Sequence, residues 1–360
     1  MKIIFNGTIF HKQKYGGISR YFCNLAKEYQ KKNINFKIST LFYKNKYLDS
    51  LRGNFKSGFY FNKIPDGKII DYSQAYYNNL HINRFKPDIV HETYYTKYLK
   101  KKNFIKITTV YDLIHEKFSK LYKNNLNKKK YLDDTDFYIC ISENTKKDLI
   151  EFYNIDEKKI KVIYLGADHI PANLKQNLIS TSIKEPFILY VGARDKYKDF
   201  NTLLNAYAAS ANLIKEFKII CFGGGKFNIE EKNKIKQLKI VDRIIYIEGN
   251  DNILSYLYHN CRCFVSTSLY EGFGIPVIEA MQNNCPTFLS NCDTYVEIAK
   301  SNAFFFEKKN IESLKYQLEN NIFEEEKLQK LVKNANIYAK NFTWNKCSEK
   351  TLNFYKSLIV

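Results

Sequence analysis

The sequence predicts an α/β protein made of two doubly wound, Rossmann-like units that face each other across a cleft. Short apolar runs alternate with helix-length segments almost throughout, which is the pattern of βαβ units around a parallel sheet. The alternation breaks once, at 171–185, where Pro, Asn, Ser and Thr are frequent. The 360 residues are also too many for one typical core and fit two domains of common size.

The first unit is predicted to span residues 1–170. Its first long helix is indicated by apolar residues at helical spacing from Ile18 to Tyr29. Ser142 directly follows an apolar run and stands where a helix cap is expected. The predicted strands of this unit are 2–5, 36–41, 89–91, 105–110, 137–141 and 161–164.

The second unit is predicted to span 186–344, after the linker at 171–185. It opens with a continuous apolar run at 187–191, which is typical of a buried parallel strand. Pro276 suits the first turn of a helix, so a helix is expected to begin there. The further predicted strands are 217–222, 244–246, 263–266, 287–290 and 303–306.

The composition is that of a soluble globular protein, with 45% hydrophobic and 26% charged residues. No run of 18 apolar residues occurs, so no membrane span is predicted. The eight cysteines are scattered, which is the pattern of a reduced, cytoplasmic protein. Cys261 and Cys263 flank Arg262 without a second matched pair, so a zinc site is not expected.

The net charge of +20 is unevenly distributed. Residues 1–176 hold 33 Lys and Arg against 17 Asp and Glu, whereas 177–360 hold 24 against 20. The lysine triplets at 100–102 and 128–130 suit an anionic partner, and we expect a peripheral association with the inner face of the plasma membrane. A general bias toward Lys, Asn and Ile is the alternative explanation. No aromatic platform motif accompanies the lysines, so no nucleic-acid partner is expected.

Glu271 and Glu279 bracket the apolar segment Glu-Gly-Phe-Gly-Ile-Pro-Val-Ile-Glu. Gly272 and Gly274 let a ligand approach the backbone closely, and a helix starting near Pro276 presents free N–H groups and a positive dipole end. These features favour a phosphate or a polyhydroxylated ring. Two glutamates eight positions apart also occur by chance on solvated surfaces. The apolar residues between them favour a cleft, where carboxylates meet donors such as sugar hydroxyls.

This segment reproduces the E-x7-E signature of family 4 of the retaining glycosyltransferases, and the chain resembles that family, in particular a mannosyltransferase-like branch. The resemblance implies the GT-B fold, with the final helix at 345–360 crossing back onto the first unit. It also implies that Glu271 contacts the sugar near the reaction centre and that Glu279 binds the ribose hydroxyls. The residues between them that are implied to line the donor site are Gly272, Phe273, Gly274 and Ile275.

A second group of candidates follows the strand predicted at 187–191. Gly192 permits close backbone approach, and Arg194 and Lys198 then supply fixed positive charge, which is what diphosphate binding requires. Two solvated surface cations are the alternative interpretation. The resemblance implies that Arg194 and Lys198 clamp the diphosphate, with Lys196 competing for the role of the lysine.

Glycine-rich turns follow other predicted strands. Gly224 is the middle of three consecutive glycines, which serve either a ligand or tight packing. Gly16 and Gly17 precede a predicted helix and leave N–H groups exposed at its start. The resemblance implies that Gly224 and Asn250 line the donor cleft and that Gly16 and Gly17 lie against the donor phosphates. Arg20 is either part of that site or a salt-bridged structural residue.

Polar residues at two strand ends of the first unit are candidates for positioning the acceptor. His91 belongs to one of these ends, and Tyr111 and Asp112 follow the next strand, with His115 beyond them. Strand carboxyl ends are where α/β proteins place their chemistry. Many members of the family have a histidine where this chain has Tyr111. This departure leaves Asp112, His91 or His115 to position the acceptor hydroxyl, although a single histidine is more often structural.

The resemblance implies a retaining glycosyltransferase that moves a hexose such as mannose from a nucleoside-diphosphate sugar to a growing, lipid-linked surface glycan, as in O-antigen or lipopolysaccharide synthesis. No cofactor is expected, and the cations replace a metal ion. No Asp-x-Asp motif stands at a strand end, since the acidic cluster at 133–136 precedes a strand and is interpreted as structural. Two alternatives remain at this point: an enzyme of the same fold that makes a soluble product, and a degenerate scaffold that binds sugar without turnover.

Overall fold

A computed structural model describes residues 1–95, 103–122, 128–167, 183, 185–194 and 196–359. The chain divides into two compact units, of which unit 1 comprises Met1–Gly166 and Thr343–Val360 and unit 2 comprises Ala167–Phe342. The sequence placed these boundaries at 170 and 344. The predicted linker at 171–185 lies outside the described residues except for Ile183 and Glu185, and so does the lysine triplet at 100–102.

Unit 1 is built on a six-stranded parallel sheet with the order β2-β1-β5-β6-β7-β8. All residues of β1 and β5 are buried, as expected for parallel strands covered on both faces. The strand predicted at 36–41 ends at Ser39, after which β3 and β4 form a separate two-stranded sheet. The strands are β1 (Ile3–Asn6), β2 (Phe36–Ser39), β3 (Phe42–Tyr43), β4 (Phe59–Tyr60), β5 (Ile89–Glu92), β6 (Ile105–Val110), β7 (Phe137–Cys140) and β8 (Ile160–Val162).

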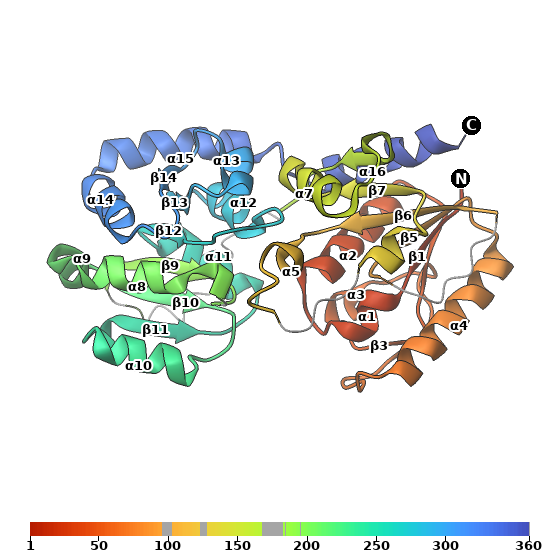
Figure 1. Ribbon diagram of the computed structural model, residues 1–360, viewed down its shortest axis with the longest axis horizontal. Coiled ribbons are helices and arrows are strands. Elements are labelled where there is room, and N and C mark those ends of the chain that lie inside the picture. The colour runs from red at the N-terminus through yellow and green to blue at the C-terminus, as the bar shows by residue number, and fades with distance from the viewer. Residues whose placement is uncertain (96–102, 123–127, 168–182, 184, 195, 360) are drawn as a thin grey trace. The chain divides into compact units, whose positions relative to one another are not determined.

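The helices of unit 1 include one that comes from the far end of the chain. Helix α16 (Trp344–Leu358) follows unit 2 in sequence but packs on α2 (Gly17–Lys31), which lies on the sheet of unit 1 (Figure 1). Phe22 of α2 meets Phe5 of β1 edge to face, with ring centroids 5.1 Å apart. The other helices are α1 (Thr8–Lys12), α3 (Lys46–Ser50), α4 (Lys68–Phe85), α5 (Ile114–Lys117), α6 (Lys129–Leu132) and α7 (Glu143–Tyr153).

Unit 2 has a second six-stranded parallel sheet, with the order β11-β10-β9-β12-β13-β14. The chain runs outward from β9 to β11 and then returns to place β12 on the other side of β9. The strands are β9 (Phe187–Val191), β10 (Lys218–Phe222), β11 (Ile244–Ile247), β12 (Cys263–Ser266), β13 (Thr287–Ser290) and β14 (Phe304–Phe306). These positions agree with the sequence prediction because buried parallel strands read as continuous apolar runs.

A hydrophobic core covers one face of the sheet of unit 2. Tyr190 and Phe306 from the strands pack there with Phe200, Leu204 and Leu314 from the helices. Capping side chains mark several helix starts, as the capping box at α10 shows. The helices are α8 (Phe200–Ala208), α9 (Ala211–Glu216), α10 (Ile229–Gln237), α11 (Asp251–Asn260), α12 (Ile275–Gln282), α13 (Asp293–Ala299), α14 (Ile311–Asn321) and α15 (Glu325–Ala339).

Candidate active site

The sheet of unit 2 has its topological switch point between β9 and β12. In open α/β sheets such a point leaves a crevice outside the carboxyl ends of the strands. Lys198 follows β9 and Glu271 follows β12, and the Lys198 ammonium donates a hydrogen bond to Glu271 Oε1 at 2.5 Å. The fold therefore brings together two candidates that lie 73 positions apart in the sequence.

Two hydroxyl groups also donate to Glu271. Ser268 Oγ reaches Glu271 Oε1 at 2.7 Å, and the Tyr295 hydroxyl reaches the same atom at 3.1 Å. Burial raises the pKa of Tyr295 well above its usual value, so this hydroxyl keeps its proton and acts as a donor at neutral pH. Because all three donors converge on Oε1, Oε2 takes part in none of these bonds and can accept from a ligand.

The main chain on each side of the pair is also fixed. Thr267 Oγ1 donates to the Lys198 carbonyl at 2.8 Å, and Thr294 Oγ1 donates to the Glu271 carbonyl at 2.6 Å. Sequence reasoning did not single out these hydroxyl residues. The hydroxylated end of β12 was a signal for the first of them, whereas Thr294 and Tyr295 lie on α13 and carry no local signal.

Helix α12 begins next to Glu271. Its N-cap is Gly274, whose φ of +93° is a conformation that favours glycine. A Cβ atom there would also lie 2.8 Å from the ring of Tyr295. Phe273 is buried against Phe342, with ring centroids 6.0 Å apart, so the turn from Gly272 to Ile275 is anchored. Pro276 has no N–H and the Val277 N–H donates to the Gly274 carbonyl at 2.9 Å, so the helix start presents its positive dipole end and only the N–H groups that come before Pro276.

Glu279 lies one turn into α12 and is almost fully buried, with 2% of its surface exposed. The hydroxyl of Tyr258, on α11, donates to Glu279 Oε2 at 3.4 Å and to the Pro276 carbonyl at 3.2 Å. This contact joins α11 to the first turn of α12. Asn250 caps the same α11 by accepting from the N–H groups of Asn252 and Ile253 at 3.1 and 3.2 Å.

Arg194 does not join Lys198 and Glu271. Its Nε donates to Glu231 Oε1 at 2.7 Å, while its two Nη atoms donate to the carbonyls of Gly223 and Gly225 at 3.1 and 2.6 Å. Only 3% of its side chain is exposed. The guanidinium therefore holds the glycine turn after β10, in a position that the sequence did not predict.

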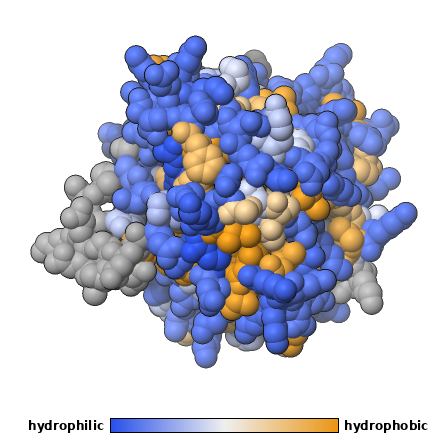
Figure 2. All heavy atoms as spheres, turned by 90° about the vertical axis from the view of Figure 1, so that its left-hand side faces the viewer, coloured by the Kyte–Doolittle hydropathy of each residue, from blue (hydrophilic) through white to orange (hydrophobic). Residues whose placement is uncertain are grey.

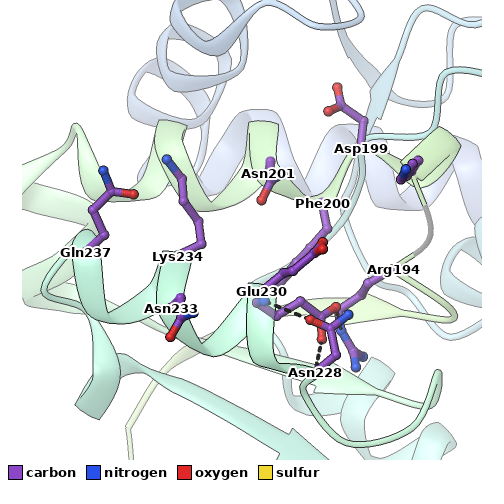
Figure 3. Close-up of a pocket in the computed structure, with 11 residues that line it drawn as sticks. Arg194, Asp199, Phe200, Asn201, Asn228, Glu230, Asn233, Lys234 and Gln237 are labelled. Atoms are coloured by element: carbon purple, nitrogen blue, oxygen red, sulfur yellow. Dashed lines mark hydrogen bonds and ion pairs between the residues drawn. The ribbon is translucent and has the colours of Figure 1, made fainter.

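Lys196 lines a pocket whose lining does not include Lys198. This pocket, of about 500 Å³, opens between α8 and α10 and is lined by Lys196 together with Arg194, Asp199, Lys234 and other polar residues. Figure 3 shows side chains of both helices along this pocket, with Arg194 at the end where Asn228 begins α10. Of the two lysines, Lys198 is the one that contacts Glu271.

His91 is enclosed within unit 1. Its Nε2 is 2.7 Å from Thr109 Oγ1, and its Nδ1 is hydrogen-bonded to the Tyr355 hydroxyl of α16. Burial lowers the pKa of His91 to about 3, so the ring is neutral at physiological pH. Because both ring nitrogens are occupied and no part of the side chain is exposed, we assign His91 to the packing of α16 rather than to acceptor binding.

The other candidates of unit 1 are partly exposed residues, although the Tyr111 hydroxyl and the His115 Nδ1 atom are themselves buried. Tyr111 is partly exposed, and its ring packs edge-on against Tyr21 with centroids 6.0 Å apart. Asp112 Oδ1 accepts from the N–H of Ile114 at 3.2 Å and so supports the start of α5. His115, on α5, packs against the ring of Tyr122 at 4.6 Å.

Gly16 and Gly17 form the start of the 15-residue helix α2. A Cβ atom at Gly17 would meet no atom within 4 Å, so the space beside this backbone is open among the described residues. Gly16 is different, because a Cβ atom there would collide with the side chain of Gln13. Arg20, in the same helix turn, is partly buried and engaged in contacts of its own.

Comparison with known proteins gives two family matches in sequence. Residues 15–169 match "Glycosyltransferase Family 4", and residues 173–337 match "Glycosyl transferases group 1". The matches together cover every strand of the two six-stranded sheets except β1. The chain belongs to family 4 of the glycosyltransferases.

The curated relatives of this family 4 glycosyltransferase include enzymes of surface-glycan synthesis. The O-antigen chain mannosyltransferase RfbU of Salmonella typhimurium is 29% identical over 46% of this chain and 45% of its own length. The O-antigen chain mannosyltransferase B of Escherichia coli is 24% identical over 63% of this chain and 62% of its own. A Campylobacter jejuni enzyme, whose name gives a diphospho-undecaprenol-linked sugar, is 27% identical over 64% and 65%. The matches thus span about half to two thirds of these relatives.

Solved structures agree with the GT-B fold over almost the whole of the glycosyltransferase. A glycosyltransferase from Rickettsia africae is 22% identical, with a TM-score of 0.77 over 99% of this chain and 98% of that one. Anabaena HepE in complex with UDP and glucose is 16% identical, with a TM-score of 0.75 over 99% and 100%. Among the described residues, no helix is both long and apolar enough to cross a membrane.

Substitution in the glycine turn of the glycosyltransferase should show how tightly the turn packs. Gly224 has a φ of +72°, and a Cβ atom would lie 2.4 Å from the Gly192 carbonyl oxygen. Gly225 has a similar φ of +80° but no atom within 4 Å of the same position. We expect Gly224→Ala to lower the free energy of unfolding by about 2 kcal/mol more than Gly225→Ala. Urea denaturation of both variants measures the difference, and equal losses would contradict the packing role.

Proposed function

We propose that this chain is a retaining, metal-independent hexosyltransferase that moves a sugar, mannose first among the candidates, from a nucleoside diphosphate to a growing, lipid-linked surface glycan. The observation that carries the proposal is the Lys198–Glu271 pair at the switch point of unit 2, beside the start of α12. The pair combines a cation for a diphosphate with a carboxylate for sugar hydroxyls. The names of the mannosyltransferase relatives support the choice of sugar, and the Campylobacter enzyme supports a lipid-linked acceptor.

The transfer breaks the bond between the anomeric carbon and the phosphate oxygen, so negative charge collects on the departing diphosphate. Lys198 and the N–H groups at the start of α12 are the groups of unit 2 that would stabilise this charge. Lys198 would then exchange its bond to Glu271 for bonds to phosphate. Glu271, still held by Ser268 and Tyr295, would turn its free acceptor capacity to the sugar hydroxyls.

The resemblance implied that Arg194 clamps the diphosphate, but this proposal gives Arg194 a different role. Its guanidinium is neutralised by Glu231 and shapes the glycine turn, so it would act on the donor by setting the position of Gly224. Glu279, one turn into α12 and in contact with the Tyr258 hydroxyl, would bind the ribose hydroxyls. Lys198 and the start of α12 would therefore be the main groups that stabilise the charge of the diphosphate.

Retention would follow from attack of the acceptor hydroxyl on the face that the diphosphate leaves, with the departing phosphate taking up the proton. Unit 1 would supply the acceptor-side groups. Of the candidates there, Asp112, Tyr111 and His115 remain in this role, together with the open backbone at Gly17.

Donor recognition provides the first test. A panel of UDP, GDP, dTDP and ADP sugars is screened by thermal shift, since a ligand that binds only the folded state raises the melting temperature. The donor that is found is then incubated with a lipid-linked oligosaccharide fraction, with and without EDTA. We expect nucleotide release, an α-linked product from an α-linked donor by NMR, and the same rate in EDTA. A donor that binds without release of nucleotide would show a binding scaffold instead of an enzyme.

A further inference from the structure

Helix α4 of unit 1 carries its apolar side chains on the outside. Ile69, Tyr72, Tyr76 and Leu80 are 83, 53, 68 and 51% exposed. Their spacing of three or four residues places them on one side of the helix. The helix runs along the outer edge of unit 1 (Figure 1). An ordinary surface helix keeps its apolar side toward the core and its polar side toward water, whereas α4 exposes these residues in addition to burying Ala75 and Ile82.

The inward side of α4 combines two buried apolar residues, Ala75 and Ile82, with the buried amide side chains Gln74 and Asn78. Gln74 is buried, accepts from the Leu41 N–H at 2.9 Å and donates to the Ser39 carbonyl at 3.1 Å. It also donates to the buried Asn78 at 2.8 Å. These bonds connect α4 to the end of β2 and fix which side of the helix faces inward. The outward position of the apolar side is therefore imposed by specific inward contacts and does not result from a loosely attached helix.

Positive charge borders the apolar side. At 100° per residue, Lys68 and Arg84 lie about 80° to either side of the apolar stripe. Both are exposed, as are Lys63 and Lys86 next to the helix ends. The three carboxylates of the same segment are each engaged by a cation. Asp66 pairs with Lys44, Asp71 with His11 and Lys12, and Asp88 with the N-terminal amine, at 3.6, 2.8 and 3.8 Å.

Exposed aromatic residues extend this surface beyond the helix. Phe59 and Phe61, in the segment that leads into α4, are 68 and 47% exposed. Tyrosine and phenylalanine beside lysine and arginine are the side chains that suit the boundary between lipid headgroups and acyl chains. We call the set Phe59, Phe61, Ile69, Tyr72, Tyr76 and Leu80 the α4 surface.

Unit 2 offers no comparable helix side among its described residues. In Figure 2, whose view faces unit 2, hydrophobic residues are surrounded by hydrophilic ones. The large exposed apolar residues of unit 2 come from separate elements, such as Ile229 on α10, Tyr316 on α14 and Ile337 on α15. They do not form a stripe on one helix.

We propose that the α4 surface binds the headgroup region of an anionic lipid bilayer, with α4 lying parallel to the membrane plane. This inference rests on the proposed function, because it gives the enzyme a place beside a lipid-linked acceptor. A second copy of the chain fits less well. In a two-fold contact the same patch meets itself, so the cations at Lys68 and Arg84 would face cations.

The test uses the full-length chain and vesicles of phosphatidylglycerol with phosphatidylcholine, or of phosphatidylcholine alone, in flotation assays. We expect wild type to bind the anionic vesicles and Ile69→Ser/Leu80→Ser to bind at least about tenfold more weakly, because two exposed apolar contacts are lost. Lys68→Gln/Arg84→Gln should weaken binding and reduce its salt dependence. The matched control is Ile229→Ser/Ile337→Ser on unit 2, which should bind like wild type.

Each outcome of this experiment bears on the proposal. Equal vesicle binding by wild type and the Ile69→Ser/Leu80→Ser variant, or no preference for anionic lipid, would overturn it. So would light scattering that shows a wild-type dimer and a monomeric variant, because the α4 surface would then join two copies. Donor thermal shift is measured on the same samples. If the chain binds vesicles as expected but recognises no donor, the role of the α4 surface is supported and only the proposed transfer is overturned.

Discussion

Replacing Lys198 with methionine is expected to lower the rate of transfer by about 100- to 1000-fold, which is the usual cost of removing one group that stabilises transition-state charge. Methionine keeps much of the apolar length of the side chain but cannot neutralise the departing diphosphate. In this variant Glu271 keeps its bonds from Ser268 and Tyr295, so unit 2 should stay folded. Initial rates and melting temperatures of the purified variant measure the two effects separately.

The matched control for this experiment is Lys196→Met. Lys196 is two positions away, but it lines the pocket between α8 and α10 and does not reach Glu271. We expect its rate to stay within about threefold of wild type, as for a surface charge away from the chemistry. A Lys198→Met enzyme of near-normal rate, or an equally inactive Lys196→Met enzyme, would show that the ion pair with Glu271 does not mark the donor phosphates.

Acid is expected to destabilise unit 1 through His91. The pKa of His91 is about 3 in the folded chain, because the ring is buried, and 6.5 is its ordinary value. Below pH 6.5 the unfolded chain therefore binds a proton that the folded chain does not, and the free energy of unfolding falls as the pH falls. Between pH 7.5 and 4.5 this contribution amounts to about 2 to 3 kcal/mol.

The neighbouring Glu92 acts in the opposite direction. Burial raises its pKa to about 7, against the attraction of Lys106, so the folded chain takes up this proton first as the pH falls. The measurement is therefore a comparison of urea unfolding at pH 7.5 and 4.5 for wild type and His91→Gln, since Glu92 is present in both. We expect the acid loss to be smaller in the variant by the amount given above. An unchanged pH dependence would show that His91 is protonated inside the fold.

The strands of the two six-stranded sheets could be predicted because most of them are buried and read as short apolar runs. The strands β3 and β4 were not predicted, because each has only two residues and is partly exposed. The candidates after β9 and β12 could also be named, since ligands collect at strand ends. The sequence could not predict which of these candidates contact one another, because that depends on the direction in which each side chain points from its turn. Arg194 and Lys198 stand four positions apart, yet one reaches Glu231 on α10 and the other Glu271.

Two other features could not be predicted from the sequence, for a different physical reason. The burial of His91 depends on Tyr355, which is 264 residues away, and no local pattern reports such a contact. Helix α4 mixes apolar and polar residues in a way that local periodicity does not resolve into an inner and an outer side. The hydrogen bonds of Gln74 and the packing of Ile82 against Ile4 and Val90 determine which side of the helix faces inward.

The place of α16 bears on how the chain is made. Unit 2 is continuous in sequence, so a ribosome synthesises all of it before the residues that complete unit 1 have been added. Until then, α2 lacks its covering helix and His91 lacks its tyrosine partner. Unit 1 thus depends on the most distant contacts in the chain, and such contacts form slowly. The half of the enzyme that is synthesised first is expected to be the half that finishes folding last.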